Sequence, residues 1–437
     1  MKRSLILIVP ILALVAIGWK VLLPRKAAPA PSASVVYPRP PYDPTRLTKT
    51  IAFYEERVRT DPKAAIESGL LSGFYSQRCR ETGDIADAVR AEKMARHALQ
   101  IRSSHNPGAW DDLAVALLAQ HRFNDALTAA QTAWKIDSED EQTQDLRIEI
   151  WTERGDYAEA SKTLQARSAS GEDMHLKALH ARLCEMNGQL ERALELLRQA
   201  QYAADRNYDL PNENVAWFHM RVGDMLAAMG NAEGAERSYQ EALALFPSDY
   251  KTLTALTRLA CGQSDWAQAV VYGQKAADVV PTPEVLALLG DALKAQGKIR
   301  QAEDQFRLIE AIGTLAKAQG TVYDRQRALY LADHERNLDE ALALARRELT
   351  IRHDVYAYDT LAWVCCKKGL LDEAQTAMQQ ALSRHTQDAR LYYHAGMIAE
   401  RRGDHAQARA YLSQALTLNP YFLPFAPDQA RKLLAQR

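Results

Sequence analysis

An alanine recurs along this chain at nearly constant intervals, a few residues after a glycine or polar turn. The nine positions of this ladder are Ala126, Ala160, Ala193, Ala235, Ala269, Ala302, Ala341, Ala374 and Ala408. Their spacings are 34, 33, 42, 34, 33, 39, 33 and 34 residues, so six of the eight lie within one residue of 34. A period of about 20 to 50 residues is typical of proteins in which one supersecondary unit stacks on the next. The spacing therefore predicts a solenoid.

The composition favours helix in every unit. Alanine and leucine dominate, the 437 residues include only 20 glycines, and runs of valine, isoleucine or threonine are few. Alanine and leucine are among the strongest helix formers. We therefore expect an all-α fold in which each ladder alanine lies in a new helix that begins after a turn.

The residues around the ladder resemble the tetratricopeptide repeat family, whose pattern is W-x2-L-G-x2-Y, then A-x3-F, then P. One unit reads His219-x2-Val222-Gly223-x2-Leu226, Ala235-x3-Tyr239, Pro247, and another reads Leu286-x2-Leu289-Gly290-x2-Leu293, Ala302-x3-Phe306. The first full unit contains Trp110-x2-Leu113-Ala114. The resemblance covers about residues 50–420.

This resemblance implies a tetratricopeptide-type α-α superhelical solenoid of about ten helix pairs over residues 49–437. A small residue in each first helix, such as Gly223, and the ladder alanine of the second helix let the two helices approach closely. A bulky residue four positions after the alanine, such as Tyr239, fills the gap to the next unit. A looser pair is expected before Trp110, and residues 428–437 are expected to form a helix that covers the last apolar face.

A different kind of segment precedes the repeats. Lys2 and Arg3 stand before an apolar stretch, residues 5–23, that is just long enough to span a bilayer. We expect residues 1–23 to form one hydrophobic signal-anchor or transmembrane helix, and the Pro- and Ala-rich residues 24–48 to form a linker. Cleavage near residues 30–32 is the alternative, although the tryptophan and basic residues at positions 19, 20, 25 and 26 fit an uncleaved anchor better.

The location of the body follows from the same segment. A short basic N-terminus usually stays in the cytoplasm. We therefore expect a single-pass protein with its body on the extracytoplasmic side of the membrane, and the resemblance suggests the bacterial inner membrane. A cleaved, secreted or periplasmic form and a cytoplasmic-facing body stay open, because positive charge flanks the apolar stretch on both sides.

Two intervals of the ladder are longer than the rest. The 42-residue spacing inserts residues 201–214, and the 39-residue spacing inserts residues 311–320. The first insertion has the composition of a helix extension followed by a polar loop. Insertions of this kind map to one face of a solenoid and sometimes contribute to binding, but drift in repeat length explains them equally simply.

The sequence carries no pattern of catalysis. It has no Walker-type loop, no G-x-G-x-x-G, no H-E-x-x-H and no nucleophile elbow. The five cysteines, Cys79, Cys184, Cys261, Cys365 and Cys366, lack metal or redox spacing and fit small buried side chains. Lys plus Arg (54) and Asp plus Glu (55) nearly cancel, which argues against nucleic acid as a partner. We expect a protein that is not an enzyme, without catalytic residues, metal or cofactor.

The resemblance also implies where partners bind, because in this family the first helix of each pair lines a concave groove. Counting along those helices gives the candidate contact residues Tyr323, Gln326, Tyr330, Tyr356, Asp359, Trp363, Tyr393, Met397, Trp217 and Arg221, with Asp111, Asp145 and Arg258 in other units. Aromatic side chains at such positions suit an extended peptide or a partner helix. The alternative is that some of them pack against neighbouring first helices.

Some family members bind chaperone C-termini through a two-carboxylate clamp of lysine and asparagine. The corresponding positions here read Asp111/Val115, Asp145/Glu149 and Thr254/Arg258, so that clamp is absent. We expect a scaffold or adaptor, tethered to the membrane by residues 5–23, whose partners are other proteins. An exported small-molecule or glycan receptor and a non-catalytic subunit of an envelope enzyme are the other hypotheses.

Overall fold

The computed structural model describes residues 39–169, 171–319 and 324–436. Residues 41–437 form one compact unit, distinct from residues 1–40. The expected N-terminal hydrophobic helix lies outside the described residues. None of the helices in the described part of the chain combines the length and the apolar character needed to cross a bilayer.

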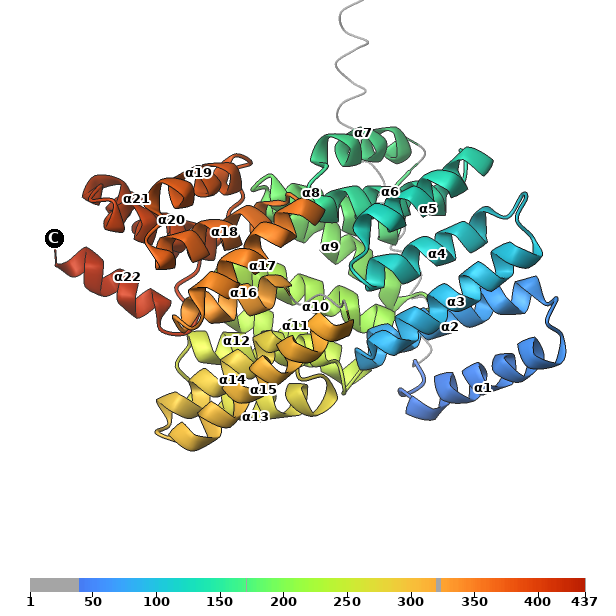
Figure 1. Ribbon diagram of the computed structural model, residues 1–437, viewed down its shortest axis with the longest axis horizontal. Helices are drawn as coiled ribbons and strands as arrows, with labels where there is room; N and C mark the ends of the chain where they lie inside the picture. The colour runs from blue at the N-terminus through green and yellow to red at the C-terminus, as the bar shows by residue number, and fades with distance from the viewer. Residues whose placement is uncertain (1–38, 170, 320–323, 437) are drawn as a thin grey trace, which may run out of the picture. The chain divides into compact units, whose positions relative to one another are not determined.

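The described residues form twenty-two helices (Figure 1). They are α1 (Pro44–Thr60), α2 (Ala65–Thr82), α3 (Ile85–Ile101), α4 (Pro107–Ala119), α5 (Phe123–Ile136), α6 (Glu141–Arg154), α7 (Tyr157–Ser168), α8 (Met174–Met186), α9 (Leu190–Asp205), α10 (Asn212–Ala228), α11 (Ala232–Leu245), α12 (Tyr250–Gly262), α13 (Trp266–Val279), α14 (Pro283–Ala295), α15 (Ile299–Gln319), α16 (Asp324–Asp333), α17 (Leu338–Ile351), α18 (Val355–Lys368), α19 (Leu371–Leu382), α20 (Ala389–Arg401), α21 (His405–Leu418) and α22 (Ala426–Ala435).

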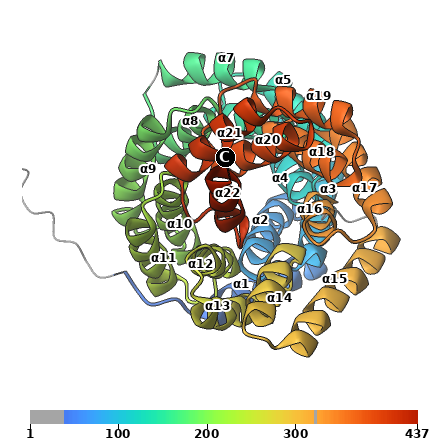
Figure 2. The same ribbon diagram turned by 90° about the vertical axis from the view of Figure 1, so that its left-hand side faces the viewer.

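Helices α2 to α21 pack as ten antiparallel pairs, from α2 with α3 to α20 with α21. This confirms the expected all-α superhelical solenoid of about ten helix pairs. Helix α1 packs on α2 at the start, and α22 packs on α21 at the end, where the sequence predicts a closing helix. The first helices, such as α10, α12 and α14, lie on the inner side of the superhelix, and α11, α13 and α15 lie outside them (Figure 2).

The predicted close packing within each pair, which we call the interlock, is present: small residues of the first helix contact the side of the second helix that carries the ladder alanine. Every ladder alanine is at most 1% exposed, and Tyr239 and Phe306 are 1% exposed. A Cβ added to Gly223 would lie 2.5 Å from the Tyr239 ring, and one added to Gly396 would lie 2.7 Å from Leu412. A larger residue in the first helix would therefore push the two helices apart, which explains the glycines at these positions.

Helix α1 begins earlier than the sequence predicts. The expected linker runs to residue 48, whereas α1 begins at Pro44. Proline suits the first helical position, and the Asp43 carboxylate caps the helix by accepting a hydrogen bond from the Thr45 N–H at 2.8 Å. Burial of Leu47 and Ile51 then holds the helix against α2.

The two long intervals of the ladder extend helices. The first one lengthens α9 to Asp205 and adds a loop before α10, in agreement with a helix extension followed by a polar loop. The second one makes α15 twenty-one residues long. Both insertions therefore leave the pairing of the helices unchanged.

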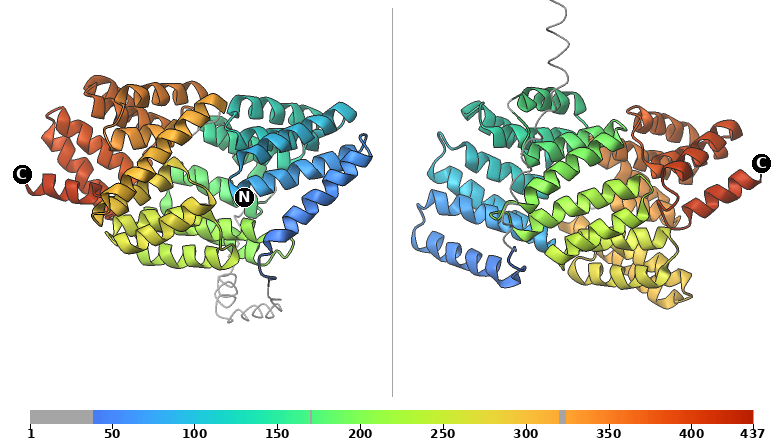
Figure 3. Two further views of the ribbon diagram at one scale, coloured as in Figure 1. Left: turned by 60° about the horizontal axis from the view of Figure 1, so that its bottom comes forward. Right: turned by 180° about the vertical axis from the view of Figure 1, so that it is seen from behind.

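The superhelix is wound so tightly that its successive turns touch. The turn inside one pair meets the linker that follows the fifth pair further along the chain. We call this line of contact the seam: it joins Gly83 to Val280, and residues 154–157, 186–188 and 230 to residues 352–355, 384–387 and 418–421. Gly262 also meets Tyr421 of the last linker, four pairs further along. Figure 3 shows that α1 and α22 lie at opposite ends of this unit. The seam lies between these two ends.

Candidate partner-binding surface

Seven of the predicted groove residues lie inside the protein instead of on an open groove; two of them, Asp111 and Asp145, are 2 and 4% exposed. The other five, Tyr330, Asp359, Trp363, Tyr393 and Met397, are 2, 0, 4, 4 and 9% exposed. For Trp363 and Asp359, the structure shows the alternative interpretation, in which side chains of neighbouring first helices pack together. Tyr323 lies outside the described residues. No partner is present, so the binding role of the ten residues stays a prediction.

Specific contacts bury the C-terminal aromatic residues. The Trp363 indole N–H donates a hydrogen bond to Asp333 at 2.7 Å, and its ring stacks on His394 at 4.2 Å between centroids. The Tyr393 hydroxyl donates to Gln429 of α22 at 2.7 Å. The closing helix thus covers part of the surface that the sequence assigns to a groove.

Asp359 is a buried ionic residue of the same cluster. Its carboxylate lies 2.8 Å from His394 Nδ1 and 3.6 Å from Arg390 Nε. Burial alone would raise the pKa of Asp359, but the charges of His394 and Arg390 and the hydrogen bond outweigh it and lower the pKa. The Asp359–His394 pair links α18 with α20, and removal of one partner would leave an uncompensated buried charge.

The other four predicted residues, Trp217, Arg221, Gln326 and Tyr356, are only half-buried. The Tyr356 ring has Arg182 over it at 5.8 Å and Arg390 at 5.4 Å from its centroid. Arg182 lies on α8 and Tyr356 on α18, so this contact spans the two superhelical turns. Cation–π contacts of this kind favour a fixed ring orientation.

Charged side chains of both signs follow the inner helices. Arg182 pairs with Glu185 at 3.0 Å, and Arg221 pairs with Glu185 at 2.8 Å and with Asp224 at 2.9 Å. Arg258 pairs with Glu284 two helices further along. We call these six residues, together with Glu149 of α6 and Asp291 of α14, the concave charge band: Glu149, Arg182, Glu185, Arg221, Asp224, Arg258, Glu284 and Asp291.

The band keeps the register of the alanine ladder. Glu149, Arg182, Asp224, Arg258 and Asp291 are 33, 42, 34 and 33 residues apart, and their charges alternate in sign. Sequence reasoning identified Arg221 and Arg258 but missed the rest of the band. The shared register with the ladder is the signal that could have found them.

The band is enclosed yet reaches water. The exposed fractions of its paired side chains run from 15% for Glu185 to 39% for Arg258. Burial would raise the pKa of Glu185 and Glu284, but the arginines beside them outweigh this effect and keep both carboxyl pKa values below their usual range. These pairs therefore present formed charges of both signs, whereas burial raises the pKa of Glu149.

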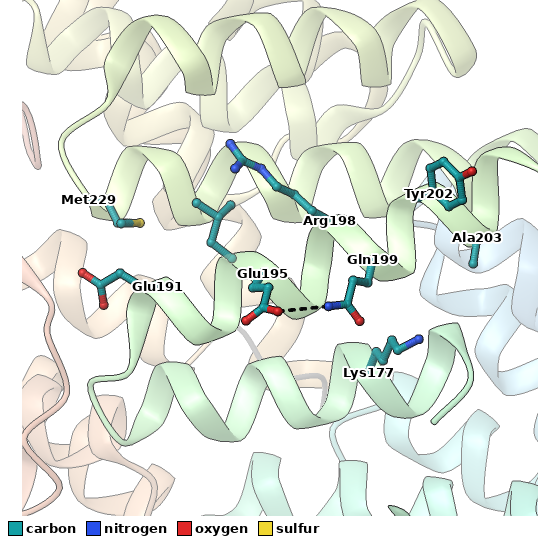
Figure 4. Close-up of a pocket in the computed structure, with 9 residues that line it drawn as sticks. Lys177, Glu191, Glu195, Arg198, Gln199, Tyr202, Ala203 and Met229 are labelled. Atoms are coloured by element: carbon teal, nitrogen blue, oxygen red, sulfur yellow. Dashed lines mark hydrogen bonds between the residues drawn. The ribbon is translucent and has the colours of Figure 1, made fainter. Parts of the chain in front are cut away.

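Two surface pockets lie elsewhere. One, of about 610 Å³, is lined by α8, α9 and the end of α10, including Lys177, Arg198 and Tyr202 (Figure 4). Its Gln199 side chain donates to Glu195 at 3.2 Å. The other, of about 540 Å³, is lined mainly by carboxylates, with Arg167 among them.

The cysteines are small buried residues, as the sequence predicts, except that Cys79 is half-buried. All five are free thiols. Burial raises the pKa of Cys261 and Cys365 to about 12, so neither is a thiolate at neutral pH. Within the described residues, no group of three or more His, Cys, Asp or Glu side chains is placed to hold a metal ion.

Comparison with known proteins gives a family match over part of the chain. A family model described as tetratricopeptide repeat matches residues 366–421, the segment of α19, α20 and α21. No curated protein sequence matches the chain.

Several solved structures are similar to parts of this chain. PilW, described as a widely conserved type IV pilus biogenesis factor, is 19% identical with a TM-score of 0.40, over 47% of this chain and 92% of that one. A tetratricopeptide repeat protein from Parabacteroides merdae is 17% identical with a TM-score of 0.39, over 55% and 93%. A thermophilic protein of the same type from Thermus thermophilus is 20% identical with a TM-score of 0.36, over 45% and 98%.

The family model covers one region, and the same interlock recurs outside it. Gly223 with Tyr239 and Gly290 with Phe306 repeat the contact that Gly396 makes with Leu412 inside the matched segment. The ladder alanines are buried in all nine positions. Residues 366–421 thus match the tetratricopeptide repeat, and helix pairs outside this segment show the same close packing.

Proposed function

We propose that this protein is a membrane-tethered scaffold that binds an extended segment of a partner protein along the concave charge band. Its fold is one that serves as a scaffold for protein–protein interaction. The single observation that carries the proposal is the band itself, which offers half-exposed charges of both signs at one-repeat intervals on the inner helices.

The chemistry of the band favours a polar segment over an apolar helix. Each band arginine already pairs with a carboxylate, so a partner must offer charges that replace these pairs. Such an exchange yields selectivity more than affinity, because unmatched charges are left desolvated. We therefore expect a partner segment with both acidic and basic residues, held in an extended conformation that can follow several repeats.

The tether is the second part of the proposal. Residues 5–23 hold the protein in the membrane, and the residues that follow them space the solenoid from it. The body then lies on the extracytoplasmic side of a bacterial inner membrane. Reporter fusions at the C-terminus test this placement: activity of a periplasm-dependent reporter supports it, and activity of a cytoplasm-dependent reporter contradicts it.

Affinity capture from native membranes, followed by mass spectrometry, tests the binding role. We expect the full chain to recover a defined set of envelope proteins and the Arg221→Ala, Tyr356→Ala double variant to lose them, because both side chains lie on or beside the band. Arg237→Ala is the matched control, since Arg237 is 65% exposed and pairs only with the exposed Glu233 on α11. Recovery of the same proteins by the double variant, or of none by the full chain, would refute the proposal.

One pocket favours a second candidate function. The pocket beside α9 carries Tyr202, which is 60% exposed, and such a ring suits stacking on a sugar or another flat ligand. A receptor of this kind would be stabilised against heat by oligosaccharides, and Tyr202→Ala would abolish the shift. A single enzyme that dominates the captured proteins would point instead to a non-catalytic subunit of an enzyme complex.

A further inference from the structure

The seam is built from a few polar bridges between turns. The His353 N–H donates to the Arg154 carbonyl at 2.8 Å, and the Thr386 hydroxyl donates to the Met186 carbonyl at 2.6 Å. The Val355 N–H donates to the Tyr157 hydroxyl at 3.2 Å. These bridges join residues about 200 positions apart in the sequence and fix the pitch of the superhelix.

Apolar contact across the seam is small compared with that between neighbouring pairs. From the second superhelical turn, the buried Val355 and Leu391 join the core of α3 to α8, and the partly buried Tyr356 and Leu382 pack against it. Neighbouring pairs, in contrast, share a continuous core, such as the one that extends from Leu253 to Ala430. Because a solenoid is held together mainly by contacts between adjacent repeats, the seam can part while the helix pairs stay packed.

Parting of the seam changes the surroundings of the concave charge band. Arg182 lies over Tyr356 at 5.8 Å only because the seam brings α8 beside α18. In the closed state Arg182 is 29% exposed. When the seam opens, α18 moves away from Arg182 and solvent or a partner reaches this part of the band more easily.

We propose that the seam is a gate: the superhelix opens along it to expose the concave charge band and closes over a bound partner segment. This inference rests on the proposed binding role of the band. It adds that the helix pairs move as intact units about the repeat-to-repeat contacts, as in a shear motion.

The chain itself offers variants that open the seam selectively. The Gly188→Ala, Gly262→Ala double variant places methyl groups against the backbone carbonyls of His385 and Tyr421 across the seam. The matched control is Gly297→Ala, Gly73→Ala, in which the same kinds of position have no atom within 4 Å. Thr386→Val, Arg384→Ala is a milder variant that adds no atom to the seam: it removes two hydrogen bonds and the contact of Arg384 with the Tyr157 ring.

Two measurements on the full chain in detergent follow the gate without a partner. Small-angle X-ray scattering reports the size of the particle, and phenylglyoxal labelling with peptide mass spectrometry reports access to Arg182. We expect the double glycine variant to be larger than the control and to be labelled at Arg182 at least about five-fold faster, with unchanged far-ultraviolet circular dichroism. Labelling of the exposed Arg237 should not change.

Each outcome bears on the proposal. Faster labelling of Arg182 in the milder variant also supports the gate, even where the glycine variant loses helicity. The gate would be overturned if the milder variant, the control and the wild type had the same particle size and the same rate of Arg182 labelling. It would also be overturned if the milder variant became larger only together with a loss of helical circular dichroism. These results are independent of the capture experiment, so the gate and the binding role can fail separately.

Discussion

The turns inside the helix pairs fall into two groups that share one sequence signal but have different surroundings. Gly155, Gly188 and Gly230 have φ angles of +90°, +73° and +75°, and a Cβ on any of them would meet the backbone of the next superhelical turn. Gly297, Gly369 and Gly403 have φ angles of +75°, +84° and +83°, and no atom lies within 4 Å of their added Cβ.

The difference follows from position along the superhelix. Each of the first three turns touches a linker five pairs further along, whereas no described residue approaches the last three turns in this way. In the seam turns (Gly155, Gly188 and Gly230), glycine is needed for two reasons: the backbone is left-handed, and another segment approaches too closely for a Cβ. In the free turns (Gly297, Gly369 and Gly403), only the left-handed backbone requires it. Substitutions at the two groups can separate these two requirements.

The largest difference is expected at the turn glycines. Gly297→Ala should lower the stability by roughly 1–2 kcal/mol, because alanine is strained at positive φ. Gly188→Ala carries the same strain and an overlap with the His385 carbonyl, which adds roughly 1–3 kcal/mol. Chemical denaturation of both variants checks the order, and equal losses would mean that the seam is absent in solution.

A change of sign is expected for two glycines within helices. Gly73 of α2 is exposed with open space around it, so Gly73→Ala should stabilise the protein by about 0.5–1 kcal/mol through its helix propensity. Gly262 ends α12 beside the Tyr421 carbonyl, so Gly262→Ala should destabilise it instead. Thermal unfolding of the two variants measures the sign, and a stabilising Gly262→Ala would contradict the close contact.

The last comparison concerns a single hydrogen bond of the seam. Thr386 is 1% exposed and its hydroxyl donates to the Met186 carbonyl. Thr386→Val keeps the shape and should cost about 1–3 kcal/mol, because a buried acceptor is left without its donor. Thr376→Val is the control: its hydroxyl also bonds a carbonyl, that of Asp372, but on an exposed part of α19. Similar losses in the two variants would argue against a special role of Thr386.

The sequence predicts the repeat and most of what lies inside a helix pair. The ladder alanines, the small residue of the first helix and the bulky residue after it are all local, and those of the units quoted above are buried as expected. The closing helix is also present, although it begins at Ala426 rather than at residue 428. Periodicity succeeds here because adjacent repeats are in contact.

The candidate surface was less accessible to sequence reasoning. The groove positions assume an open concave face, but Trp363 is covered by His394 and Tyr393 by Gln429 of the closing helix. The seam was not predicted at all, because the pitch is the sum of small rotations over five pairs. A glycine in a seam turn and a glycine in a free turn occupy the same position of the repeat, so the sequence does not distinguish them.

Cross-linking across the seam tests the closed superhelix most directly. Asp156 and His353, whose side chains lie 3.1 Å apart, can be changed to cysteine in a Cys79→Ser background, which leaves the four buried thiols in place. A short bismaleimide should then join Asp156→Cys to His353→Cys within one chain, and peptide mass spectrometry should recover that pair in high yield. An intact, helical protein that forms no such intrachain link would contradict the closed superhelix.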